Sequence, residues 1–208
     1  MLVKLVYNKY MLIKRPEPTT VDQLFSETEL RELQEACKKI SKTVLFDNGF
    51  GRYATNHHQF PFLKEAGEKL LPLARQIFNS ETLLPSYTMF VHYEGPKAKL
   101  RKHRDDNACT YTLDMCLYQN QTWDLWVENK SYTLQENQAL AYYGNDQIHW
   151  REKFPNPDTQ HVAMIFFHFV EPDHWYYTKG TQYWTLLRGE ITKEQWENEV
   201  RHYEINKP

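Results

Sequence analysis

No stretch of this sequence is apolar for long enough to cross a membrane, because no window approaches the roughly 18 apolar residues that a spanning helix requires. The first residues are apolar only in short pieces, since Lys4 and Asn8 interrupt them, so we expect no signal peptide. The sequence has three cysteines, and none forms a Cys-x-x-Cys pair. These features predict a cytoplasmic protein in a reducing compartment, with no membrane among its partners.

Positive charge is not in excess either. The formal net charge is −2, so the chain lacks the basic footprint of nucleic-acid-binding domains, and we expect no nucleic-acid partner. The basic run from Lys97 to Arg104 could contact phosphates, but a short charged run is more often a solvated edge, and we favour that interpretation. Nothing in the sequence indicates the oligomeric state.

What the chain does have is length and aromatic side chains. Its 208 residues suffice for one domain with a substantial core, and we find no repeat or linker that would divide residues 1–208. Aromatic residues make up 15% of the chain, which suits a β-rich core or a lined pocket. We therefore expect one compact domain.

Two N-terminal helices are indicated. Ser26 and Glu29 form a capping box, and the apolar residues that follow at helical spacing predict a helix from Glu27 to about Ser41. A second apolar stripe predicts a helix over Phe62–Phe78, which Pro72 should kink or divide. Such helices would pack on the outer face of a β-sheet and brace it.

Short β-rich runs dominate the rest of the chain, with turns between them at intervals typical of a sandwich or barrel. A strand is also expected near the N-terminus, and a capping box at Thr192 predicts a C-terminal helix. The aromatic-rich segment 171–187 could be a lid or a dimer surface, although packing against the barrel is the simpler interpretation. The predicted strands are Leu2–Lys14, Ser86–Tyr93, Thr110–Tyr118, Trp123–Val127, Ser131–Leu134, Ala139–Tyr143, Ile148–Glu152 and His161–Val170.

The most informative residues are His103 and Asp105, in the pattern His-x-Asp, with His149 well downstream. Two imidazoles and one carboxylate are the ligand set that holds one face of an octahedral Fe(II) and leaves three positions open. If His103 and Asp105 share a strand, their side chains point to the same side, and His149 would join them from another strand. The alternative is that His103 and Asp105 belong to a charged surface loop.

At these residues the chain resembles the Fe(II)/2-oxoglutarate-dependent dioxygenases. Tyr93, ten residues before His103, resembles the tyrosine that often precedes the family's His-x-Asp, and His161–Val170 resembles the closing strand of its barrel. The resemblance covers about residues 86–170. It implies a mainly β, α+β fold, a double-stranded β-helix (jelly-roll barrel) braced by the N-terminal helices. It also implies Fe(II) held by His103, Asp105 and His149, with 2-oxoglutarate and O₂ as co-substrates.

One departure from the family pattern concerns the far carboxylate of 2-oxoglutarate. Many members carry an Arg or Lys about ten residues after the distal His, where this chain has Thr159, Gln160 and His161. A buried carboxylate still needs a cation, and a bidentate Arg is the usual partner. Arg151 is our first choice, with help from Tyr93, because it lies two residues beyond His149 and so on the same strand face. His161 is the second choice.

By resemblance, the activity would be hydroxylation of a substrate with release of succinate and CO₂. Asp105 argues against halogenation, because family halogenases replace this carboxylate. Two alternatives stay open: a cupin-like metalloenzyme that does not use 2-oxoglutarate, and a non-catalytic β-barrel binding module. The substrate, a small molecule or a peptidyl side chain, is not evident from the sequence.

Overall fold

The computed structural model describes residues 15–179, apart from 43, 44, 48, 50 and 157, together with residues 192–194. The strand expected at Leu2–Lys14, the C-terminal helix beyond residue 194 and the aromatic-rich segment beyond residue 179 lie outside the described residues. No helix among the described residues is both long and apolar enough to cross a membrane.

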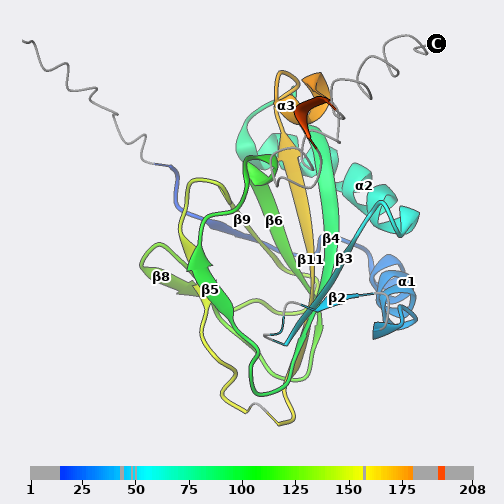
Figure 1. The fold of residues 1–208 in the computed structure, drawn as a ribbon, viewed down its shortest axis with the longest axis vertical. Coiled ribbons are helices and arrows are strands. Elements are labelled where there is room, and N and C mark those ends of the chain that lie inside the picture. The colour runs from blue at the N-terminus through cyan, green and yellow to red at the C-terminus, as the bar shows by residue number, and fades with distance from the viewer. Residues whose placement is uncertain are drawn as a thin grey trace, which may run out of the picture.

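Two antiparallel β-sheets form the walls of a barrel (Figure 1). The larger sheet has the strand order β1-β9-β6-β11-β4-β3-β2, and the smaller sheet has the order β5-β10-β7-β8. The strands of the larger sheet are β1 (Thr19–Val21), β2 (Phe46–Asp47), β3 (Arg52–Asn56), β4 (Leu84–Glu94), β6 (Tyr111–Gln119), β9 (Ala139–Tyr142) and β11 (His161–Val170). Those of the smaller sheet are β5 (Leu100–His103), β7 (Leu125–Val127), β8 (Lys130–Tyr132) and β10 (His149–Arg151).

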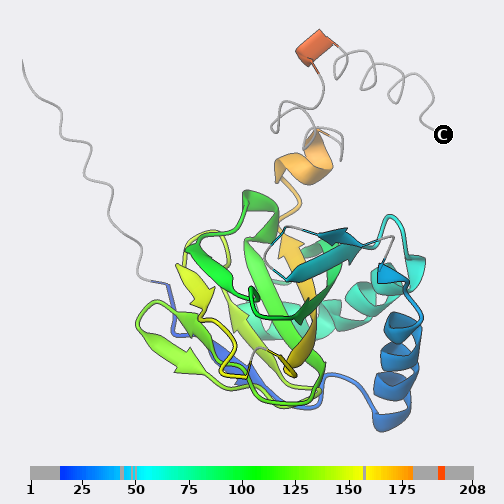
Figure 2. The same ribbon diagram turned by 60° about the horizontal axis from the view of Figure 1, so that its bottom comes forward.

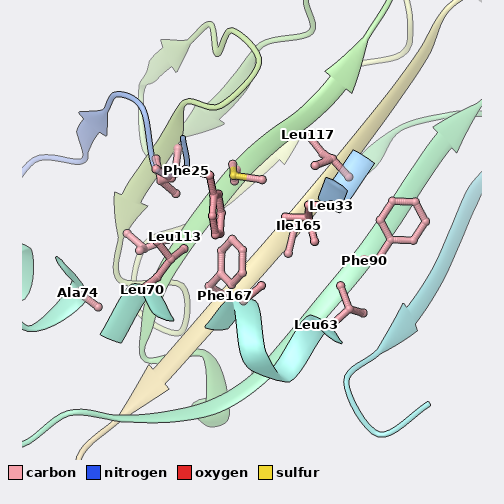
Figure 3. Close-up of a cluster of buried hydrophobic side chains, with 14 of the residues drawn as sticks. Phe25, Leu33, Leu63, Leu70, Ala74, Phe90, Leu113, Leu117, Ile165 and Phe167 are labelled. Atoms are coloured by element: carbon pink, nitrogen blue, oxygen red, sulfur yellow. The ribbon is translucent and has the colours of Figure 1, made fainter. Parts of the chain in front are cut away.

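The helices cover the outer face of the larger sheet. Both α1 (Glu27–Lys38) and α2 (Pro61–Phe78) lie on the side away from β5 and β8 (Figures 1 and 2). Leu33 of α1 and Leu63 of α2 pack in one buried cluster with Ile165 and Phe167 of β11 (Figure 3). The short helix α3 (Trp175–Thr178) follows β11. The bracing role expected for the two N-terminal helices is confirmed.

Local sequence explains where these helices begin and end. The capping box is present, because Ser26 Oγ accepts from the Glu29 amide while the Glu29 carboxylate accepts from the Ser26 amide. Helix α1 ends at Lys38, three residues earlier than expected. Helix α2 runs through Pro72 without being divided, and Asn79 closes it in the left-handed conformation.

The side chains of β11 alternate between two buried clusters, one beneath the helices and one inside the barrel. Ala163, Ile165 and Phe167 face the helices, whereas Val162 and Met164 face the barrel interior. A strand buried on both faces reads as a continuous apolar run, which is why β11 was predicted with its observed bounds. The strands β1, β2 and β3 were not predicted, because their sequences show little alternation of apolar and polar residues.

Helix α2 lies close against β4 at Gly67. A methyl group placed on this residue would lie 2.4 Å from Thr88 Oγ1, closer than such atoms can pack. We predict that Gly67→Ala destabilises the protein in the wild-type background by about 1–3 kcal/mol. In a Thr88→Ala background the same change should stabilise it by up to about 1 kcal/mol, because alanine is the better helix former. Chemical denaturation of the four proteins measures both effects, and equal effects of Gly67→Ala in the two backgrounds would contradict the contact.

Candidate metal centre

Strand pairing in the smaller sheet brings the two predicted histidine ligands together. His103, at the end of β5, stands directly opposite His149, at the start of β10. Their ring centroids are 4.3 Å apart. His149 is buried, whereas the side chain of His103 is 36% exposed, so the pair opens to solvent on the β5 side.

Asp105 completes the group, but not from the strand that was expected. Strand β5 ends at His103, so the argument that His103 and Asp105 share one strand face is wrong. The chain turns instead, and the Asp105 amide donates to the carbonyl of Gly144, in the loop before β10, over 2.9 Å. This bond directs the carboxylate back to the histidines, with Oδ1 lying 3.2 Å from His103 Nε2 and 3.4 Å from His149 Nε2.

The hydrogen bonds around the two histidines show which nitrogen of each ring faces Asp105. His103 Nδ1 lies 2.7 Å from the Arg101 carbonyl, and His149 Nδ1 lies 3.0 Å from the Gln147 carbonyl. A carbonyl can only accept, so each Nδ1 carries a proton, and Nε2 is the ring nitrogen that faces Asp105. Two imidazole Nε2 atoms and a carboxylate oxygen, all within 4.8 Å of one another, therefore form a group that could hold a metal ion.

The pKa shifts of Asp105 and His149 reflect the contact between them. Burial alone would raise the pKa of Asp105, but its contacts with His103 and His149 outweigh burial and hold the pKa well below its ordinary value. Burial lowers the pKa of His149, but the Asp105 carboxylate opposes this and the net shift is upward. Asp105 is thus ionised at neutral pH, as a metal ligand must be.

Gly144 leaves room for the Asp105 carboxylate. A methyl group at this position would lie 2.6 Å from Asp105 Oδ2 and 2.7 Å from Thr112 Oγ1. It would also lie 2.8 Å from the Cys109 carbonyl, which is backbone and cannot yield easily. No residue other than glycine fits beside Asp105 without moving it.

Arg151 points into the barrel, as expected. It is 3% exposed, donates to the Trp123 carbonyl, and has Nη2 at 3.7 Å from Met164 Sδ. Its guanidinium also lies over the Trp123 ring, 5.0 Å from the centroid. Within the described part of the chain, no carboxylate lies within ion-pairing distance of Arg151, although a buried cation is costly without one.

A second arginine, which sequence reasoning missed, lies in the same interior. Arg52 of β3 stands opposite Tyr93 of β4, and its Nη2 donates to Met89 Sδ over 3.1 Å, a weak acceptor for a guanidinium. The Tyr93 hydroxyl is fully buried and has no acceptor for its proton among the described residues. Burial raises the pKa of Tyr93, while the charges of Arg52 and Arg151 act in the opposite direction, so both guanidiniums lie near this phenol.

His161 is not brought to the triad. It lies on the helix-covered face of the larger sheet, where its ring stacks on His92 at 6.1 Å and meets the edge of Tyr118. The next residue, Val162, is the one that faces the barrel interior. Position 161 therefore points away from the space that Arg151, Arg52 and Tyr93 share.

Two further buried groups stand close to the triad. Burial lowers the pKa of His168 to about 4, so this imidazole is neutral, and its Nδ1 lies 3.1 Å from Thr112 Oγ1. Asp114 Oδ2 accepts from the Tyr142 hydroxyl over 3.0 Å, and burial raises the pKa of Asp114 to about 7. No motif in the sequence marked either residue, since each looks like an ordinary strand position.

No protein-family model and no curated protein matches the chain. Solved structures do match. A viral collagen prolyl hydroxylase from Paramecium bursaria Chlorella virus-1, in complex with 2-oxoglutarate, has a TM-score of 0.55 at 13% identity, covering 74% of this chain and 96% of its own. HygX from Streptomyces hygroscopicus, with nickel and 2-oxoglutarate bound, has a TM-score of 0.60 at 10% identity, covering 75% and 83%.

The carbocyclase SnoK from nogalamycin biosynthesis, a non-heme alpha-ketoglutarate-dependent enzyme, has a TM-score of 0.61 at 10% identity, covering 75% of this chain and 80% of its own. This chain has their double-stranded β-helix fold. The resemblance found in the sequence is thereby confirmed for the fold. In this double-stranded β-helix the triad lies between β5, β10 and the loop that precedes β10.

We predict that Gly144→Ala weakens metal binding, because the added methyl group displaces the Asp105 carboxylate. The loss should be about 10- to 100-fold in Mn(II) affinity, the range seen when the support of a metal ligand is disturbed. Calorimetric titration of Mn(II) measures it, and thermal unfolding checks that the fold is kept. Unchanged affinity in a folded variant would show that Gly144 does not control the position of Asp105.

Proposed function

We propose that this protein is a non-haem Fe(II)- and 2-oxoglutarate-dependent oxygenase. One observation carries the proposal. The barrel contains both the His103, Asp105 and His149 triad and two guanidiniums that have no carboxylate partner among the described residues. The triad suits a divalent metal, and the guanidiniums suit the far carboxylate of a dicarboxylate that chelates it. That structures of this fold have been solved with 2-oxoglutarate supports the same reading.

His103, Asp105 and His149 would hold Fe(II). The Arg101 and Gln147 carbonyls fix the two imidazoles in the tautomer that offers Nε2. When bound, Fe(II) and 2-oxoglutarate would supply the activation of O₂ that oxidises a substrate C–H bond, with succinate and CO₂ as products.

The far carboxylate of 2-oxoglutarate would lie between Arg151, Arg52 and the Tyr93 hydroxyl. All three are donors, and none is saturated by a protein carboxylate in the described structure. Arg151 is held by Trp123, whose ring also packs edge-on against Tyr93 at 5.0 Å. The apolar walls around these donors exclude water, which strengthens each charged contact.

Hydroxylation is the outcome we propose, on a small-molecule or peptidyl substrate. Related folds include an epimerase and a carbocyclase as well as hydroxylases, so the product has to be established directly. Succinate formation with Fe(II), 2-oxoglutarate and a metabolite library, followed by mass analysis of the consumed compound, tests this. A mass gain of one oxygen supports hydroxylation, whereas an unchanged mass or the loss of two hydrogens would point to the other outcomes.

We predict that Asp105→Ala loses Fe(II) binding but keeps the fold. Removing a ligand should cost more than disturbing its support, so affinity should fall by at least about 100-fold. The neighbouring exposed carboxylate gives a matched control, Asp106→Ala, which should bind Fe(II) as the wild type does. Anaerobic Fe(II) titration and circular dichroism separate the two properties. Full Fe(II) affinity in Asp105→Ala would remove this residue from the metal centre.

We predict that Arg151→Lys weakens 2-oxoglutarate by roughly 1.5–3 kcal/mol, the typical value of a charged hydrogen bond, because an ammonium cannot reproduce the guanidinium fork. This corresponds to about one to two decades in dissociation constant. Arg52→Lys should weaken it in the same direction, and the exposed Arg31→Lys should have no effect. Titration of 2-oxoglutarate into the Fe(II)-loaded proteins, followed by the charge-transfer band, measures all three. An unchanged midpoint in both barrel variants would favour a metalloenzyme that does not use 2-oxoglutarate.

A further inference from the structure

The barrel interior contains an acid that the proposed function does not use. Asp114, in the middle of β6, is 3% exposed and is the only Asp or Glu of the described residues that is fully buried. A buried carboxylate normally has a cation beside it. No Lys or Arg of the described residues lies within ion-pairing distance of Asp114, and its side chain has one hydrogen bond, from the Tyr142 hydroxyl.

Strand geometry places Asp114 at the depth of the proposed co-substrate pocket. Thr112, two residues earlier in β6, lies beside Gly144 and Asp105 at the level of the triad. Side chains return to the same face every second residue, so Asp114 is one step deeper than Thr112. Arg151 is likewise one step deeper than His149. A dicarboxylate that reaches from the triad to Arg151 would therefore occupy the same depth of the barrel as Asp114.

The charged and titratable groups that act on Asp114 come from several elements. Asp105, in the turn after β5, disfavours its ionised form, whereas His149 and Arg151 of β10 and the hydroxyl of Tyr142 on β9 favour it. Burial outweighs the favourable contacts and raises the pKa of Asp114 to about 7. The negative charge of Asp114 in turn acts to raise the pKa of Tyr93 on β4 and of Cys109, so it affects groups on more than one side of the barrel.

Binding of both the metal and the co-substrate would not favour the ionised form of Asp114. A divalent metal brings two positive charges and 2-oxoglutarate brings two negative charges, so the pair together leaves the net charge of the interior unchanged. The far carboxylate of the co-substrate, however, would share the barrel interior with Asp114. Two carboxylates that share one low-dielectric space cannot both stay ionised without a large cost.

We propose that 2-oxoglutarate binds the form of the protein in which Asp114 carries a proton, so that the co-substrate enters together with one proton. This inference rests on the proposed function, and it assigns Asp114 the role of setting the charge of the co-substrate pocket. The un-ionised acid can keep the Tyr142 hydrogen bond at one oxygen and donate from the other. The binding reaction is protein with ionised Asp114, plus 2-oxoglutarate dianion, plus H⁺, giving the complex with neutral Asp114.

Calorimetric titration of 2-oxoglutarate into the Mn(II)-saturated protein tests this without any turnover. Repeating the titration in two buffers of different ionisation enthalpy gives the number of protons taken up. Because the acid is neutral below its pKa and ionised above it, the dissociation constant should rise with pH above the pKa that Asp114 has in the Mn(II)-loaded protein, approaching tenfold per pH unit. In Asp114→Asn, which cannot ionise, proton uptake should disappear, affinity should become independent of pH, and binding at about pH 8 should be tighter than in the wild type.

Asp124→Asn is the matched control, because Asp124 lies outside the barrel interior with its carboxylate bound to Thr133 Oγ1. It should keep the wild-type pH profile. Should Asp114→Asn fail to fold, Tyr142→Phe provides a second test. Removing the donor that favours the ionised acid should move the rise in dissociation constant to higher pH.

Three results would overturn the inference, and they are distinguishable. Tight 2-oxoglutarate binding with no proton uptake, the same in wild type and Asp114→Asn, would contradict the role of Asp114 while leaving the proposed function intact. Absence of 2-oxoglutarate binding at every pH, in a protein that still binds Mn(II), would contradict both. A pH profile that shifts equally in Asp124→Asn would assign the effect to surface charge.

Discussion

Three electron-pair donors aimed at one point are the constraint on which the rest of this structure depends. His103, Asp105 and His149 would repel one another if nothing positive joined them, so each must be held by the surrounding chain before a metal arrives. Carbonyls of neighbouring residues hold the two rings, and the Gly144 carbonyl holds the backbone of Asp105. The helices on the outer face of the larger sheet brace that wall of the barrel, while β5 and β10 of the smaller sheet carry the two histidines.

The interior below the triad is polar in a way that an ordinary barrel core is not. Two guanidiniums, a buried phenol and a buried acid sit among Val91, Leu125, Met164 and other apolar side chains. Each of these polar groups costs free energy unless a partner satisfies it. The two guanidiniums and the phenol are all donors, so their arrangement suits the anion site that we propose.

Much of this could be read from the sequence. The capping box at Ser26, the two-sided apolar run of β11 and the spacing from His-x-Asp to His149 each depend on local pattern, and the fold agrees with all three. The turn that brings Asp105 back to the histidines could not be read, because it depends on a hydrogen bond to Gly144, 39 residues away. Arg52 and Asp114 could not be identified for the same reason. Strand pairing puts Arg52 opposite Tyr93, and it brings Asp114 within hydrogen-bonding distance of Tyr142 on the neighbouring strand.

The position of His103 on β5 has a mechanical consequence. Within the described structure β5 pairs with β10 alone, so it is the edge strand of the smaller sheet, four residues long, with an irregular register against its neighbour. An edge strand this short has little to hold it. A metal bonded to His103 and to His149 would join this edge strand to the strand beside it. Binding of the ion and ordering of the edge of the barrel would then be coupled.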